Sequence, residues 1–197
     1  MLISEEMLLA YGATYENYNP QDMIFTEGSM PKFYFQIVTG TVELNNYRED
    51  GKEFIQNIIS DGQSIGESIL FVKQPYPMNA QAASSCTILR LPESDFFSLL
   101  EQNTEVLHKT FQLLSERLYY KYTMLFSVSS NDPAIKIKSL FDYLKLTKGS
   151  KEESFVIPYT RQQIANLTGL RVETVIRTIK KMQQENIVKI DNRKIIY

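Results

Sequence analysis

The chain has 197 residues, 43% of them hydrophobic and 22% charged, so it is long enough to bury a core and too apolar for a disordered tail. Its formal net charge of −2 conceals two opposite parts, because residues 1–132 hold 8 Lys and Arg against 17 Asp and Glu, whereas residues 133–197 hold 13 against 6. The resulting net charges of −9 and +7 predict an acidic domain followed by a basic one, and the basic domain suits a polyanion such as DNA.

Few residues are available for redox or metal chemistry. One cysteine, Cys86, excludes an internal disulfide and a cysteine-built zinc or iron–sulfur site, and one histidine, His108, leaves little for a histidine-built metal centre. The start of the chain is acidic, unlike a signal peptide, and no apolar run approaches the roughly 20 residues of a membrane span. We therefore expect a cytoplasmic protein with no metal, haem or cluster and no membrane partner, although a small-molecule effector stays open.

Residues 22–91 are predicted to form short strands separated by turns. Stretches rich in Ile, Val, Phe, Tyr and Thr alternate with glycines 11 or 12 residues apart, which is typical of an all-β sandwich or roll. The pair Asp50-Gly51 is a strong hairpin signal between residues 41–45 and 53–59. The regularly spaced glycines are Gly28, Gly40, Gly51 and Gly62.

The segment Gly66-Glu67-Ser68 has two interpretations. Its backbone N–H groups and polar side chains suit a small ligand, and the same residues also suit a turn with a capped short helix. The residues by themselves favour the second interpretation. Pro75 and Pro77 then interrupt the chain before a further apolar pair of strands within residues 80–91.

Residues 103–131 contain no glycine or proline and predict a helix about 40 Å long. Its apolar residues recur at steps of three, four and seven, which places them on one seam. The seam packs either against its own β domain or against a second copy of the chain, and the length of the helix favours a parallel homodimer. The predicted dimer interface consists of Leu107, Phe111, Leu114, Leu118, Leu125 and Val128.

The basic domain is predicted to hold two short helices and a terminal hairpin. A helix starts at Asp132-Pro133, a polar loop covers Lys148–Ser154, and a short strand covers Phe155–Pro158. Thr160 and Gln163 then form a capping-box pattern.

The helix that follows the capping box ends at Gly169, and a second helix covers Val172–Glu185. Such a pair is typical of a helix-turn-helix, and a hairpin with its turn at 191–193 adds a wing. The cations of the second helix fit either DNA or a merely solvated face, and the charge of +7 favours DNA. The residues expected to contact double-stranded DNA are Thr160, Arg161, Gln162, Arg171, Glu173, Thr174, Arg177, Lys180, Lys181 and Arg193.

The whole chain resembles the Crp/Fnr family of bacterial transcriptional regulators. In the first domain the resemblance rests on Gly40, Gly51, Gly62 and the segment 66–68, and in the second on residues 161–165 and 172–177. It implies an α+β fold with an antiparallel, jelly-roll-like β-roll of the cyclic-nucleotide-binding type, a dimerisation helix and a winged helix-turn-helix. The expected domains are 1–102, 103–131 and 132–197 in that order.

The resemblance also implies where an effector would bind. In the members that bind cyclic AMP, a glutamate holds the ribose and an Arg-Ser pair holds the phosphate. Glu67 matches the glutamate, whereas Tyr76 and Pro77 stand where the pair is expected, so we predict no binding of cyclic AMP. The effector pocket expected from the family comprises Gly66, Glu67, Ser68, Tyr76, Lys121 and Tyr122.

For DNA, the resemblance implies that Glu173 and Arg177 reach base edges in the major groove. A carboxylate accepts from the amino group of cytosine and a guanidinium bridges O6 and N7 of guanine. The run is similar to that of the Fnr branch except that Ile176 replaces a serine, which implies a half-site containing TGA. The expected function is a homodimeric regulator on a palindromic operator, with RNA polymerase as a partner if it is an activator.

Two other classes of protein remain as alternatives. Metal-dependent enzymes are built on β-rolls of similar shape, but they need inward histidines on strands, and His108 lies in the predicted long helix. A ligand- or protein-binding module whose helix-turn-helix does not bind DNA is the second alternative. We expect no enzymatic activity.

Overall fold

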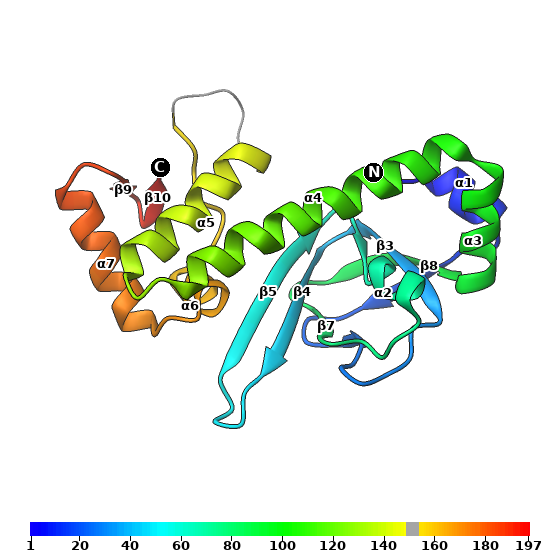
Figure 1. The fold of residues 1–197 in the computed structure, drawn as a ribbon, viewed down its shortest axis with the longest axis horizontal. Coiled ribbons are helices and arrows are strands. Elements are labelled where there is room, and N and C mark those ends of the chain that lie inside the picture. Colours follow the sequence, from blue (N-terminus) through cyan, green and yellow to red (C-terminus); the bar gives the residue numbers. More distant parts are fainter. Residues whose placement is uncertain (149–153) are drawn as a thin grey trace. The chain divides into compact units, whose positions relative to one another are not determined.

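The computed structural model describes residues 1–148 and 154–197 (Figure 1). Most of the predicted polar loop, residues 149–153, lies outside the described residues. The chain divides into two compact units, Met1–Ser115 and Glu116–Tyr197. No helix within the described ranges is long and apolar enough to cross a membrane.

The strands of the first unit form two antiparallel sheets of four strands, which confirms the predicted β-roll. Sequence neighbours such as β3 and β4 belong to different sheets, as in a jelly roll. One sheet has the order β1 (Thr14–Tyr18), β8 (Cys86–Pro92), β3 (Phe33–Thr39) and β6 (Ser64–Ile65). The other has the order β2 (Met23–Phe25), β7 (Asn79–Ala82), β4 (Thr41–Tyr47) and β5 (Glu53–Ser60).

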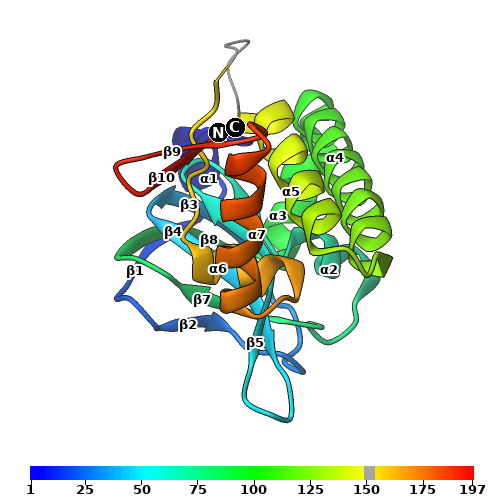
Figure 2. The ribbon, with the colours of Figure 1, turned by 90° about the vertical axis from the view of Figure 1, so that its left-hand side faces the viewer.

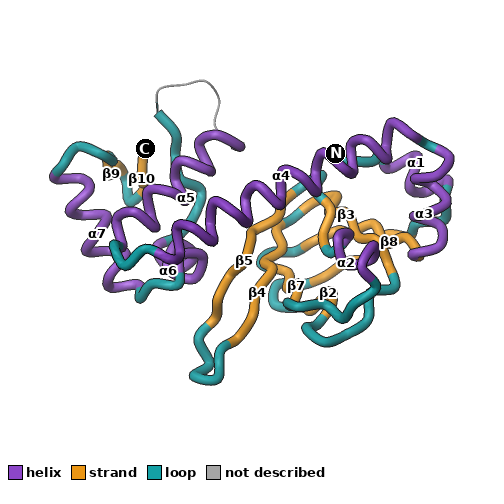
Figure 3. The backbone as a smooth tube through the Cα atoms, viewed as in Figure 1, coloured by secondary structure: helices purple, strands orange, loops and turns teal. Residues whose placement is uncertain are grey.

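The β4–β5 hairpin turns where the Asp-Gly pair predicts it, at the far end of the two strands in Figure 3. Gly51 has a φ of +77°, a conformation that residues with a Cβ rarely adopt. The N–H of Arg48 donates to the carbonyl of Lys52 across 2.9 Å and closes the turn. The prediction of this hairpin is confirmed.

Two apolar cores lie on opposite faces of the β3 sheet. Because successive strand residues point to opposite faces, Phe35 and Ile37 enter the core between the sheets, whereas Tyr34 enters a second core on the outside. The outer core includes residues of α1 (Glu5–Ala10) and α3 (Glu93–Gln102). There the rings of Tyr34 and Phe96 stack with centroids 4.4 Å apart.

After β6 in the chain, α2 (Glu67–Val72) follows Gly66, whose φ is +74°, and its Leu70 enters the outer core. The turn and the short helix predicted for this segment are therefore present, but no side chain caps the start of the helix. After α3, helix α4 (Thr104–Ser129) runs for 26 residues without a break and confirms the predicted long helix.

In the described part of the second unit, three further helices and a hairpin follow α4 (Figure 2). The predicted cap is present at α5, because the Asp132 carboxylate accepts from the N–H of Ala134 across 2.8 Å. The predicted strand at Phe155–Pro158 is reduced to one bridge between Val156 and Ile196. The elements are α5 (Pro133–Lys148), α6 (Arg161–Thr168), α7 (Val172–Gln184), β9 (Lys189–Asp191) and β10 (Lys194–Ile196).

Candidate nucleic-acid interface

The start of α6 is fixed by a reciprocal pair of hydrogen bonds. The N–H of Gln163 donates to Oγ1 of Thr160 across 3.1 Å, and the N–H of Thr160 donates to Oε1 of Gln163 across 3.0 Å. The capping box predicted from the sequence is therefore present, and it satisfies two N–H groups that a helix start leaves free. α6 ends at Gly169, which has the left-handed φ of 68° that this turn needs.

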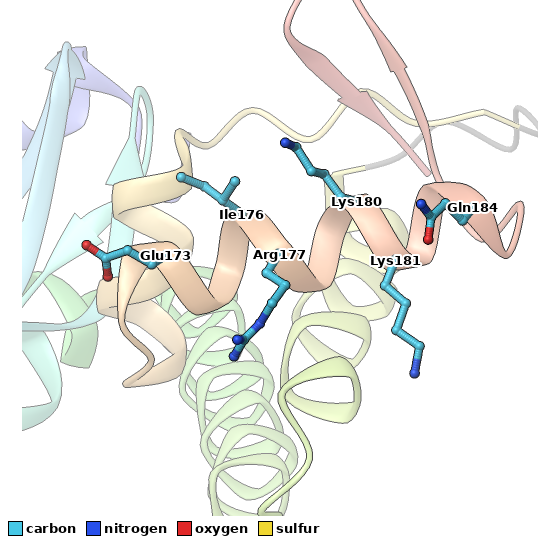
Figure 4. A pocket seen from close by; sticks show the side chains of 6 residues that line it. All are labelled: Glu173, Ile176, Arg177, Lys180, Lys181 and Gln184. Carbon is cyan, nitrogen blue, oxygen red and sulfur yellow. The ribbon is translucent and has the colours of Figure 1, made fainter.

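α7 presents two chemically different faces. Val175, Ile179 and Met182 are buried at steps of four and three, which fixes the rotation of the helix against its own unit. Six exposed residues on the other side of α7 line a hollow (Figure 4): Glu173, Ile176, Arg177, Lys180, Lys181 and Gln184.

The outer face of α7 is mostly cationic. Figure 4 shows Ile176 and Lys180 along one edge of this face and Arg177 and Lys181 along the other, with Glu173 at the first turn. The Lys181 ammonium lies 3.7 Å from the carboxylate of Glu185, one turn further on. An exposed face with three cations and one carboxylate can contact phosphates and base edges at once.

The β9–β10 hairpin forms a wing joined to the start of α6. Its central residues, Asn192 and Arg193, have φ values of 45° and 66°, and two residues with positive φ make a type I′ hairpin turn. The guanidinium of Arg161 donates to the carbonyl of Arg193. This bond connects the wing to α6, so the two elements are held as one surface.

The predicted DNA contacts all lie on α6, α7, their caps or the wing turn. Arg161 and Thr174 are half-buried, and the other eight are exposed. Ile176 and Gln184 also line the hollow, although neither is among the DNA contacts expected from the sequence. Their helical spacing was the available signal, since Ile176 lies three residues after Glu173 and Gln184 four after Lys180.

The predicted dimer residues lie along α4. Phe111, Leu118, Leu125 and Val128 are exposed, whereas Leu107 and Leu114 are half-buried. Tyr122 is also exposed, and we define Leu118, Tyr122 and Leu125 as the α4 stripe. The opposite side of this part of α4 is buried, where the Tyr120 ring lies 4.3 Å from that of Tyr143 on α5.

The region of the predicted effector pocket is filled by aromatic rings. Phe25 and Tyr76 stack with centroids 3.8 Å apart and an angle of 9°. A Cβ added at Gly66 would lie 2.9 Å from the Tyr76 ring and 3.0 Å from that of Phe25. Glu67 is fully buried. Burial of the Tyr76 hydroxyl, and secondly the nearby Glu67 carboxylate, raise the pKa of Tyr76.

The other predicted pocket residues are placed differently. Ser68 is exposed, as are Lys121 and Tyr122, which belong to the second unit. Desolvation and the charge of Arg117 lower the pKa of Lys121.

A cavity of about 300 Å³ does lie in the β-roll, and of the six predicted residues it includes Tyr76. Lys32 is the one cation in its lining, whereas Arg90 bonds to Glu16. The Arg90 guanidinium also lies 3.9 Å from the centre of the Phe33 ring. The cavity is lined by Met23, Ile24, Phe25, Thr26, Ser29, Met30, Lys32, Phe33, Phe35 and Tyr76.

Comparison with known proteins identifies both units. The family described as Cyclic nucleotide-binding domain matches residues 15–103, and the family described as Crp-like helix-turn-helix domain matches residues 140–197. The cAMP-activated global transcriptional regulator CRP of Escherichia coli O157:H7 is 24% identical over 182 residues, 91% of this chain and 87% of that protein. The transcriptional activator protein anr of Pseudomonas aeruginosa is 22% identical over 88% of this chain and 72% of its own length.

Solved structures show the same fold. A mutant of CooA from Carboxydothermus hydrogenoformans has a TM-score of 0.84 at 16% identity, covering 98% of this chain and 87% of that one. The c-di-GMP responsive regulator CLP of Xanthomonas campestris has a TM-score of 0.76 at 19% identity, covering 97% and 96%.

A β-roll, a long helix and a winged helix-turn-helix together define a class of DNA-binding transcriptional regulators. Within that class, the chain belongs to the Crp/Fnr family. The predicted family and the predicted α+β fold are both confirmed.

Proposed function

We propose that this Crp/Fnr-type regulator binds a palindromic operator as a homodimer and reads it with the outer face of α7. The observation that carries the proposal is that face itself, where Glu173, Arg177 and Lys180 are exposed and the other side of the helix is buried. A helix of this kind fits the major groove of B-DNA. Such a role places the protein in the cytoplasm, where the DNA is.

Glu173 and Arg177 are the base-reading residues in this proposal. A carboxylate accepts a hydrogen bond from the amino group of cytosine, and a guanidinium donates two to O6 and N7 of guanine. The remaining predicted contacts supply phosphate binding, which holds the protein on the duplex without reading sequence. These residues are Thr160, Arg161, Gln162, Arg171, Thr174, Lys180, Lys181 and Arg193.

Dimerisation through α4 accounts for the α4 stripe. Leu118, Tyr122 and Leu125 are 50%, 63% and 71% exposed, and they recur at steps of four and three along one line of the helix. A second copy of α4 would cover them, and two α7 helices related by a two-fold axis would read two half-sites about 34 Å apart. We assign residues 1–102 to the effector domain, 103–131 to the dimer helix and 132–197 to DNA binding.

Cyclic AMP is excluded as the effector in this proposal, although the CRP relatives are named for their activation by it. The stacked rings of Phe25 and Tyr76 occupy the space in front of Gly66, and the backbone of Tyr76 is held by two hydrogen bonds, to Gly28 and Ser29. A cyclic phosphate placed there would also lack a free guanidinium, since Arg90 is bonded to Glu16.

Calorimetry tests the exclusion of cyclic AMP. We expect no saturable heat at micromolar nucleotide with the full-length protein, and a saturable micromolar isotherm would refute the exclusion. The name of the Pseudomonas aeruginosa relative describes an activator. If this chain also activates transcription, RNA polymerase is its further partner.

Selection from a library of random duplexes tests the function as a whole. The full-length protein at moderate salt is expected to enrich one two-fold-symmetric sequence with G·C pairs at matching positions in each half. A dimeric protein that enriches no sequence would instead support the alternative, a ligand- or protein-binding module with a non-functional helix-turn-helix.

A further inference from the structure

The outer face of α7 contains one apolar residue among its charged and polar ones, and binding to phosphates does not account for it. Ile176 is 42% exposed and lines the hollow together with Glu173, Arg177, Lys180, Lys181 and Gln184, all of which are polar. It follows directly after the buried Val175, so its exposure comes from the fixed rotation of the helix. A large apolar side chain in water gains free energy when a partner covers it.

A base edge in the major groove offers one apolar group. Guanine, cytosine and adenine present hydrogen-bond donors and acceptors there, whereas thymine adds a C5-methyl group. Figure 4 shows Ile176 beside Lys180 on the edge of the face opposite to Arg177. We propose that Ile176 is a specificity-determining residue that packs against the methyl group of one thymine in each half-site.

This inference rests on the proposed function and makes it more specific. Glu173 lies three residues before Ile176 and is its neighbour on the helix surface, whereas Arg177 lies on the opposite edge of the same exposed face (Figure 4). The carboxylate and the guanidinium select G·C pairs, and Ile176 adds the selection of a T·A pair beside them. Neither charged neighbour can make this distinction, because they recognise donors and acceptors and not a methyl group.

Replacement of thymine by deoxyuridine tests the contact directly, because it removes the methyl group and keeps base pairing. Starting from the selected operator, each thymine of one half-site is replaced in turn, and the affinity of the full-length protein is measured. We expect one position where the wild type loses about fourfold in affinity, as for one buried methyl-sized group. Ile176→Ala is expected to bind the two duplexes at this position equally well.

Lys180→Ala is the matched control, because it alters the neighbouring side chain and leaves Ile176 in place. It is expected to weaken binding to every duplex and to keep the fourfold difference between thymine and deoxyuridine. Circular dichroism is expected to show both variants folded, since both side chains are exposed.

The possible failures of the inference and of the proposed function are distinct. If an operator is selected but no thymine shows a loss that Ile176→Ala abolishes, the inference is wrong and the proposed function stands. A deoxyuridine effect that persists in Ile176→Ala contradicts it in the same way. If no sequence is selected at all, the proposed function fails and the inference fails with it.

Discussion

Arg177 lies on the exposed face of α7, so its guanidinium is accessible for a bidentate contact with guanine. Arg177→Ala removes that contact, so we expect a loss of about 1 to 3 kcal/mol on the selected operator and less discrimination at one G·C position. Competition binding with operators altered one base pair at a time measures both effects.

Lys180→Ala serves as the control for Arg177→Ala, since Lys180 lies on the same face and is assigned to phosphate. It should weaken all sequences alike and reduce the salt dependence of binding by about one counterion. If the two variants show the same change in specificity, the assignment of base and phosphate contacts is wrong.

Gly66 is the residue at which the close packing of Phe25 and Tyr76 against the backbone can be measured. Gly66 and Gly51 have nearly equal φ values, +74° and +77°, but an added Cβ meets two rings at Gly66 and nothing within 4 Å at Gly51. Gly51→Ala is expected to cost about 1 kcal/mol from the backbone. Gly66→Ala is expected to cost about 1 to 3 kcal/mol more, from the overlap with Phe25 and Tyr76.

Urea unfolding followed by circular dichroism compares the two variants. Equal costs for Gly66→Ala and Gly51→Ala would mean that the rings move aside easily. The space in front of Gly66 would then be open to a ligand, and one argument against cyclic AMP would be lost.

At the scale of elements, the proposed dimer depends on α4. Leu125 of the α4 stripe is 71% exposed and Leu146 of α5 is 73% exposed. Because the two exposures are nearly equal, a substitution at Leu146 is a suitable control for the same substitution at Leu125. Leu125→Glu is expected to shift the protein from dimer to monomer, because it buries a charge in the proposed interface. Leu146→Glu is expected to leave the dimer intact.

Analytical ultracentrifugation at micromolar concentration measures the outcome for both variants. A wild-type protein that sediments as a monomer would contradict the proposed interface. So would a Leu125→Glu variant that dimerises as strongly as the wild type.

The ends of elements were largely predictable, because local residues determine them. The capping box of Thr160 and Gln163, the cap at Asp132 and the turn at Gly51 each depend on residues within a few positions of one another. The sequence therefore predicted the β4–β5 hairpin, the helix-turn-helix and the cationic face of α7, whereas α1, β1 and α3 were not predicted.

The features that the sequence did not predict depend on distant residues. The stack of Phe25 on Tyr76 and the bond from Arg161 to the carbonyl of Arg193 join residues that lie far apart in the chain. No periodicity in the sequence predicts such pairs, because the packing of the sheets and of the wing brings them together. The sequence placed Ile176 on the second helix without predicting its exposure, which follows from the burial of Val175, Ile179 and Met182 on the other side of α7.

At the scale of the whole molecule, the net charge of −2 is the sum of two oppositely charged segments. The segment 133–197, with its net charge of +7, contains α5, α6, α7 and the wing, and the segment 1–132, with −9, contains the β-roll. A cationic unit is attracted to DNA and an acidic unit is repelled from it. The charge distribution thus favours DNA contact through the winged helix-turn-helix.

Competition binding at physiological salt tests the central claim most directly, with three duplexes: the selected palindrome, the same duplex with one half-site scrambled, and a fully scrambled duplex. Sequence reading by a dimer predicts the tightest binding to the palindrome, weaker binding to the single half-site, and at least about a thousandfold weaker binding to the scrambled duplex. Equal affinity for all three duplexes would contradict a homodimer that reads an operator through α7.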